Sequence, residues 1–211
     1  MANATRIVLV RHGEANVNVR RIVGGPLGDS GLTPLGVAQA QRLAARLSRS
    51  REFDADVLVS SPLARARETA EIALAHRASK LRLDDSLEEL RVGESDGMTF
   101  SDAMLRWGVP DLYGAPDSVF CPGAESYNMF QRRVRAALRG LADRHDGGTV
   151  MAFTHGGVID LSFASFFDLP EATAPTLAFA TRHTALTVWT RKDRESGWKL
   201  ERYNDVAHLT G

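Results

Sequence analysis

The sequence contains little cysteine and no long apolar run. Cys121 is the single cysteine among the 211 residues, so no disulfide can form within the chain. No segment approaches the roughly 20 apolar residues that a membrane span needs. The first residues also lack the apolar stretch of an export signal. We therefore expect a cytoplasmic protein in a reducing compartment, with no membrane partner.

An excess of charge of either sign is absent as well. The chain has 26 Lys and Arg residues against 26 Asp and Glu residues, which gives a formal net charge of zero. Proteins that hold nucleic acid by bulk electrostatics carry a positive excess, so we expect no nucleic-acid partner. The cations consist of 23 arginines and only three lysines. A GC-rich genome would explain this bias, but forked guanidinium groups also suit phosphate, and composition alone does not decide between the two explanations.

Short apolar segments alternate with amphipathic ones along a chain whose length predicts a single domain, residues 1–211. Apolar runs predict strands at residues 7–10, 57–59, 149–153 and 184–190, and helical periodicity predicts helices at 33–48, 61–76, 126–146 and 158–167. This order predicts a three-layer α/β/α fold, with a mostly parallel central sheet flanked by helices. Residues 79–123 contain Pro110, Pro116, Pro122 and several glycines, and we expect an irregular, lid-like insertion over the active site there.

Histidines and arginines follow the expected strands directly. Arg11–Glu14 comes after the first strand, Ser60–Arg65 after the second, and Thr154–Gly157 after the third. The carboxyl ends of parallel strands form one edge of a sheet, so these segments should lie together. Two His-Gly pairs and two arginines at one edge predict a small site for a phosphate group rather than separate structural residues.

These motifs resemble those of the histidine phosphatase superfamily, also called the phosphoglycerate mutase-like family. The strand followed by Arg-His-Gly-Glu at 11–14 is the signature of that family. Further matches occur in family order at residues 32–40 (LTPLGVAQA), 61–70 (SPLARARETA), 87–97 (LEELRVGESDG), 123–126 (GAES) and 155–156 (HG). The resemblance implies a phosphoglycerate mutase-like fold.

The chemistry of these residues fits phosphoryl transfer. Arg11 and Arg65 can each donate paired hydrogen bonds to phosphate oxygens, and His155 can donate another, with a positive charge if it is protonated. The resemblance assigns phosphohistidine formation to His12. It also assigns two roles to Glu89, which gives a proton to the leaving group and later takes one from water. It also implies substrate or phosphate contacts for a further set, namely Gly13, Asn18, Glu125 and Gly156. We expect no metal and no cofactor.

Several alternatives stay open from the sequence. Glu88 competes with Glu89, and Arg67 competes with Arg65, although the family spacing favours Glu89 and Arg65. Glu14 is expected to orient its loop rather than to act in catalysis.

Three functions remain in contention. A phosphatase acting on a small phosphomonoester is favoured over a cofactor-dependent phosphoglycerate mutase. The resemblance implies a longer insertion with more basic residues for a mutase, whereas the segment from Leu87 to Gly123 is short and has only Arg91 and Arg106 as cations. An inactive phosphate-binding module is the third. Departures from the family pattern at Ser95, Ala124 and His183–Thr184 leave the substrate undetermined. Trp107, Leu112 and Tyr113 would either cover the site or meet a second copy in a homodimer.

Overall fold

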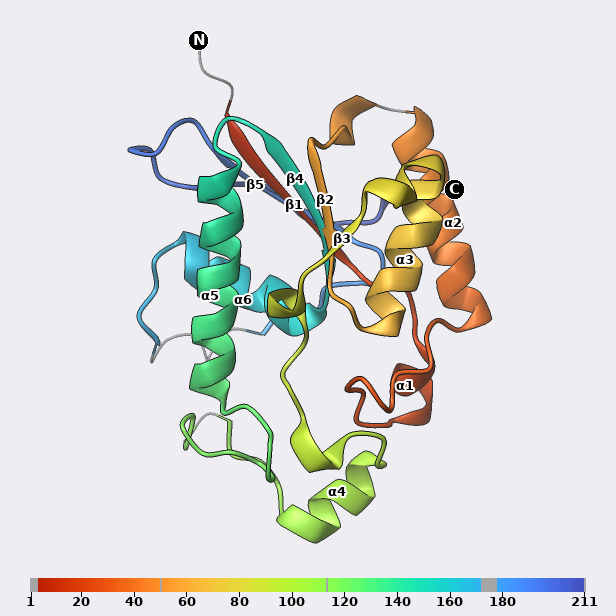
Figure 1. Ribbon diagram of the computed structural model, residues 1–211, viewed down its shortest axis with the longest axis vertical. Helices are drawn as coiled ribbons and strands as arrows, with labels where there is room; N and C mark the ends of the chain where they lie inside the picture. Colours follow the sequence, from red (N-terminus) through yellow and green to blue (C-terminus); the bar gives the residue numbers. More distant parts are fainter. Residues whose placement is uncertain (1–3, 50, 113, 172–177, 211) are drawn as a thin grey trace.

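The computed structural model describes residues 4–49, 51–112, 114–171 and 178–210. A six-stranded sheet forms its centre, in the order β3-β2-β4-β1-β5-β6 (Figure 1). The strands are β1 (Thr5–Arg11), β2 (Val57–Ser60), β3 (Arg82–Leu83), β4 (Thr149–Thr154), β5 (Leu186–Arg191) and β6 (Lys199–Asp205). Strands β1 to β4 pair in parallel, whereas β5 and β6 run antiparallel. The expected α/β fold is confirmed, and the sheet is mixed because its last two strands reverse direction.

Within the described residues, six α-helices surround the sheet or extend from it. They are α1 (Asn16–Arg20), α2 (Pro34–Arg49), α3 (Ala64–Leu74), α4 (Phe100–Trp107), α5 (Tyr127–Arg144) and α6 (Gly156–Phe166). Short 3-10 turns lie at Arg51–Phe53, Ala75–Lys80, Asp85–Leu87, Gly93–Ser95 and Ala207–Leu209. None of the helices in the described ranges is both long enough and apolar enough to cross a membrane.

The alternation of side chains along β1 explains the three layers. Ile7 and Leu9 face one side and pack with residues of α5 and α6. Val8 and Val10 face the other side and pack with residues of α2 and α3. Because successive strand residues point to opposite faces, a fully apolar strand needs a helical layer on each side.

Polar side chains fix where two of the predicted helices begin. The hydroxyl of Thr33 accepts a hydrogen bond from the Gly36 amide (3.0 Å), one turn into α2. The hydroxyl of Ser126 accepts one from the Met129 amide (3.2 Å) at the start of α5. Each hydroxyl satisfies an amide that has no partner within its helix, so the sequence signals for these two starts are confirmed.

The segment 79–123 is more regular than the sequence predicts. It contains β3 and the eight-residue helix α4, whose first turn is capped by the Thr99 hydroxyl accepting from the Asp102 amide (3.1 Å). Figure 1 shows α4 beyond the carboxyl ends of the parallel strands, on the same side of the molecule as α1. The predicted contact residue Tyr113 lies outside the described residues.

Candidate active site

The loop after β1 carries His12 at the edge of the sheet. The side-chain Nδ1 of His12 lies 2.7 Å from the carbonyl oxygen of Gly13. A carbonyl only accepts, so Nδ1 carries the proton and the Nε2 lone pair is free. Burial, followed by the charges of Arg65 and Arg11, holds the pKa of His12 well below its ordinary value. The ring is therefore a neutral, nucleophilic imidazole at pH 7.

Close backbone packing holds this loop in place. A Cβ at Gly36 would lie 2.0 Å from the carbonyl oxygen of Glu14, so the start of α2 touches the loop directly. The Gly13 amide donates to the Thr69 hydroxyl (2.9 Å), which in turn donates to the Arg65 carbonyl (2.6 Å). Gly13 is thus part of the support beneath His12. The predicted orienting role of Glu14 matches its contacts, since its carboxylate accepts from the Thr33 hydroxyl (2.8 Å).

A cavity of about 700 Å³ opens above His12, and we call it the His12 cavity. Of the residues predicted for the site, Arg11, His12, Asn18, Arg65, Glu89 and Gly156 line it. The side-chain oxygen of Asn18 accepts a hydrogen bond from the Ala15 amide (3.1 Å). This bond does not use the side-chain NH₂ group of Asn18. The structure therefore brings together six predicted residues from five separate parts of the chain.

Arg65 is held by a partner that the sequence does not reveal. Its Nη1 donates to Asp29 Oδ2 (2.9 Å), and the Arg65 backbone amide donates to the same oxygen (3.0 Å). Nη1 also donates to the Gly24 carbonyl (3.0 Å). A guanidinium has five N–H donors, so others remain for a ligand.

Arg11 is the second cation of the cavity. One of its terminal nitrogens donates to the Thr181 carbonyl, while its buried Nε has no partner among the described residues. A buried donor without a partner is costly, so this N–H suits an incoming oxyanion. Arg67, the competitor of Arg65, pairs instead with Glu71 on the outer side of α3.

His155 lies behind the cavity rather than in its wall. Its ring is fully buried and its centroid is 5.3 Å from that of His12. Nε2 lies 2.8 Å from the Ser61 hydroxyl, and Nδ1 has no partner among the described residues. Burial, then Arg65, lowers the pKa of His155 well below its ordinary value. It is therefore neutral at pH 7, and it can offer a hydrogen bond but not the positive charge considered from the sequence.

The carboxylate of Glu89 lies in the cavity and that of Glu88 does not. Glu89 Oε2 accepts from the Gly157 amide at the start of α6 (3.0 Å), and Oε1 accepts from the Leu90 amide (3.1 Å). Glu88 pairs with Arg91 (2.8 Å). A Cβ at Gly157 would meet Glu89 Oε1 at 2.3 Å, so the glycine makes room for this carboxylate.

Glu125 is not brought to the His12 cavity. Its two carboxylate oxygens accept from Arg133 (2.8 and 2.7 Å), and Oε2 also accepts from the Arg91 amide (3.1 Å). These donors lower the pKa of Glu125 in spite of its burial. An ionised carboxylate in this position does not suit a phosphate contact.

Sequence reasoning missed two residues near the site. Arg133 donates to the carbonyl oxygens of Ser86, Glu88 and Glu89 (2.9–3.1 Å), so it holds the segment that carries Glu89. His183 has its ring centroid 5.5 Å from that of His12, and its Nδ1 lies 3.2 Å from the His12 carbonyl. The only signal for His183 was its departure from the family pattern.

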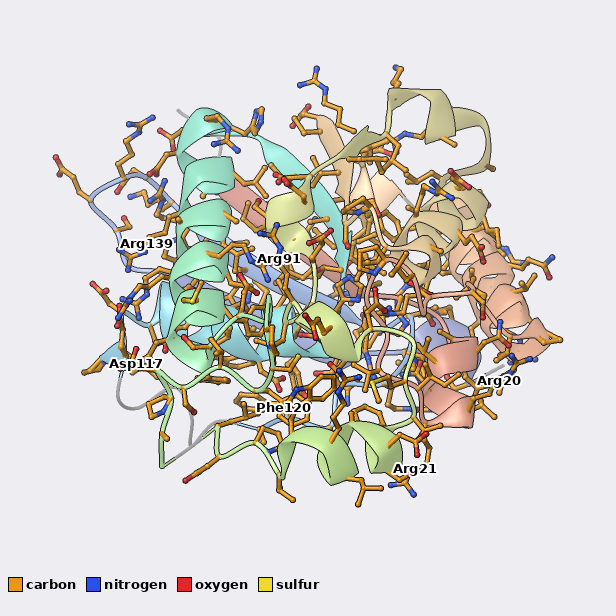
Figure 2. The ribbon with its side chains drawn as sticks, turned by 60° about the horizontal axis from the view of Figure 1, so that its bottom comes forward. Arg20, Arg21, Arg91, Asp117, Phe120 and Arg139 are labelled. Atoms are coloured by element: carbon orange, nitrogen blue, oxygen red, sulfur yellow. The ribbon has the colours of Figure 1, made fainter. Side chains whose placement is uncertain are left out.

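A metal would need several ligands in one place. Within the part of the chain that the structure describes, no group of three or more His, Cys, Asp or Glu residues has that arrangement. The charged groups that line the His12 cavity are instead Arg11, Arg21, Arg65 and Glu89, with Arg21 near the edge of the molecule beside α4 (Figure 2).

Comparisons with known proteins agree with this geometry. A sequence model of the histidine phosphatase superfamily (branch 1) matches residues 7–206. "Phosphoglycerate mutase-like protein 4" of Arabidopsis thaliana is 34% identical over 213 residues, covering 96% of this chain and 86% of that protein. The "metal-independent phosphoserine phosphatase" of the same plant is 29% identical over 215 residues, covering 99% and 85%. Among solved structures, YhfR of Bacillus stearothermophilus superposes with a TM-score of 0.81 at 28% identity, covering 98% and 100%.

Proposed function

This chain belongs to the histidine phosphatase superfamily, and from that premise we propose that it hydrolyses phosphate monoesters through a phosphohistidine on His12. The observation that carries the proposal is a neutral His12 with a free Nε2, in one cavity with the guanidinium groups of Arg11 and Arg65 and the carboxylate of Glu89. Phosphoryl transfer needs these parts, because the enzyme mainly positions the nucleophile and stabilises charge on the phosphate oxygens.

The proposed reaction has two steps. The Nε2 lone pair of His12 forms a bond to phosphorus as the ester P–O bond breaks, and the leaving oxygen takes the proton of Glu89, which enters this step as the carboxylic acid and leaves it as the carboxylate. Glu89 then takes a proton from water, whose oxygen forms a bond to phosphorus as the N–P bond breaks. The products are an alcohol and inorganic phosphate, and His12 and Glu89 return to their starting states.

The side chains around phosphorus have separate roles. Arg11 and Arg65 hold the equatorial oxygens and balance their charge throughout. His155 lies behind the cavity next to the His12 ring, and its Nδ1 carries the proton when the Ser61 hydroxyl donates to Nε2. Asn18 adds its side-chain amide at the edge of the cavity, and the segment 79–123 acts as a lid over it.

Hydrolysis of p-nitrophenyl phosphate tests the proposal. His12→Ala should lower kcat/KM by at least about 1,000-fold, because it removes the nucleophile. Glu89→Gln should lower kcat by about 100- to 10,000-fold, the usual contribution of a general acid or base. Glu88→Gln is the matched control and should keep the parent rate. Folded His12→Ala protein with the parent rate would disprove the nucleophile, and an inactive parent would favour a phosphate-binding module.

The mutase alternative has support in the names of several relatives, yet the cavity favours hydrolysis. A mutase must hold a second phosphate group, and beyond Arg11 and Arg65 the arginine that lines the cavity is Arg21, near the molecular edge (Figure 2). Conversion of 3-phosphoglycerate should therefore release phosphate and form no 2-phosphoglycerate, with or without 2,3-bisphosphoglycerate. Stimulated formation of 2-phosphoglycerate would reverse this assignment.

A further inference from the structure

A second cavity, of about 420 Å³, lies beneath α4, and we call it the α4 cavity. It adjoins the His12 cavity, because six residues line both: Val23, Leu90, Val92, Phe100, Met104 and Leu112. All six are apolar. A molecule with its phosphate at His12 would therefore meet a hydrocarbon wall on the way from one cavity to the other.

The far side of the α4 cavity is apolar as well. Ala103 and Trp107 contribute the inner side of α4, and Phe120 lies opposite them. The rings of Trp107 and Phe120 meet edge to face, with centroids 6.0 Å apart. Figure 2 shows Phe120 between α4 and the body of the molecule. The helix thus roofs a cavity built from aliphatic and aromatic side chains.

Each polar side chain that lines the α4 cavity already has a partner within the protein. Arg91 pairs with Glu88 (2.8 Å) and Glu125 with Arg133 (2.7 Å), whereas Asp111 accepts from the Gly114 amide (2.6 Å). The hydroxyls of Ser95 and Ser118 donate to the carbonyls of Val92 and Ala115 (2.6 and 2.7 Å). A charged or hydroxylated group entering here would have to compete with these existing bonds for partners, and giving up water without regaining its hydrogen bonds is costly.

On the basis of the proposed function, we propose that the preferred substrate is the phosphate monoester of an apolar alcohol, whose hydrocarbon group fills the α4 cavity. The α4 cavity adjoins the His12 cavity, so a substrate bound at His12 can extend into it. Its polar side chains already have partners, so its lining favours a hydrocarbon group. Small polar esters such as phosphoserine and 3-phosphoglycerate would leave the cavity empty. Burial of hydrocarbon would then distinguish the preferred substrate from these esters.

A series of n-alkyl phosphates tests this directly. Ethyl, butyl, hexyl and octyl phosphate have nearly the same leaving group, so differences in kcat/KM report binding of the chain. Burying one methylene contributes about 0.8 kcal/mol, which corresponds to about fourfold per carbon. We expect kcat/KM to rise steeply along the series and to exceed the values for phosphoserine and 3-phosphoglycerate. Equal values for all chain lengths would overturn the inference.

Variants on α4 test whether the α4 cavity causes the preference for long chains. Ala103 is buried in the cavity wall, and Ala103→Phe should fill the space and lower the ratio of octyl to ethyl kcat/KM by at least tenfold. Leu105 is 88% exposed on the same helix, so Leu105→Phe is the matched control and should keep the parent ratio. If Ala103→Phe fails to fold, Met104→Glu, at a position 40% exposed, places a charge in the shared wall and should lower the same ratio. An unchanged ratio in a folded variant would contradict the assignment.

The assay separates this inference from the function on which it rests. An enzyme that hydrolyses p-nitrophenyl phosphate but ignores chain length has the proposed function and a different ligand for the α4 cavity. An enzyme that hydrolyses none of the esters lacks the proposed function. If size-exclusion chromatography shows a dimer whose formation abolishes the preference for long chains, the cavity is a contact between two copies, and the inference fails.

Discussion

The buried pair of Asp29 and Arg65 allows the sharpest prediction. The side chains are 1% and 5% exposed, and Asp29 accepts three hydrogen bonds: two from Arg65 on Oδ2 and one from the Gly31 amide on Oδ1 (3.1 Å). Asp29→Asn keeps the shape but loses the charge. It also replaces one acceptor with an NH₂ group, which must then face either the Gly31 amide or the two donors of Arg65.

The structure sets the size of the effect. A buried donor left without a partner costs about 1–3 kcal/mol, and breaking a buried ion pair costs about 3–5 kcal/mol. These costs overlap, so we expect Asp29→Asn to lower the free energy of unfolding by about 3 kcal/mol. For a chain of this length that corresponds to a fall in Tm of about 6–12 °C. Because Arg65 loses the group that orients it, inhibition by vanadate should also weaken by about tenfold.

Urea denaturation and vanadate inhibition measure the two effects independently. Glu71→Gln is the matched control, because it removes a half-exposed partner of Arg67 on the same helix as Arg65. It should change stability by less than about 0.5 kcal/mol and leave inhibition unchanged. The reasoning is refuted if Asp29→Asn unfolds within about 1 kcal/mol of the parent and binds vanadate equally well.

Four further predictions follow from the site. Gly157→Ala should lower kcat by about tenfold or more through displacement of Glu89, while Tm holds or rises because alanine favours helix. Arg133→Lys should lower both stability and kcat, since an ammonium has three donors for the five bonds that Arg133 makes; urea unfolding and kcat report this. Burial raises the pKa of Asp160 from 3.8 to about 6, so the folded state binds this proton more tightly and stability falls between about pH 4 and 6. Asp160→Asn should therefore be more stable than the parent at pH 7, and equal to it below pH 4, when Tm is followed against pH. EDTA should leave hydrolysis of p-nitrophenyl phosphate unchanged, and a strong loss would contradict the proposed mechanism.

The parts of the fold with strong hydrophobic periodicity were predictable from the sequence. Strands β1, β2 and β4 are apolar on both faces, and α2 and α5 have clear capping residues. By contrast, β6 (Lys199–Asp205) lies at the edge of the sheet with mostly polar residues, so its sequence lacks a strand pattern. Helix α4 was hidden by the surrounding prolines and glycines, although Thr99 and the spacing of Phe100, Ala103, Met104 and Trp107 indicate it in retrospect.

The residues of the site also divide into those that the sequence predicts and those that it does not. Residues that follow strands were predictable because parallel strands end at one edge, and His12, Arg11 and Arg65 indeed line one cavity. The partners that hold these side chains were not predictable from the sequence. For example, Asp29 and Arg65 are 36 residues apart, and their pairing depends on how the chain between them folds back. Glu125 is the converse case, because it lies outside the His12 cavity. A motif assigned it to the substrate, but the motif does not show that Arg133, two turns later, faces the same carboxylate.

The charge of the pocket depends on its histidines and arginines together. Three histidine rings lie together, with His155 and His183 at 5.3 and 5.5 Å from His12. Burial and the neighbouring guanidinium charges lower the pKa of each, to about 4 for His183, so the rings are neutral at pH 7. The positive charge that attracts phosphate thus belongs to Arg11 and Arg65. Burial is the larger cause that keeps the proton off Nε2 of His12, and the same two charges add to it, because a further positive charge beside them is unfavourable. Binding of the phosphate and readiness of the nucleophile therefore depend on the same pair of arginines, and weakening either one should affect both.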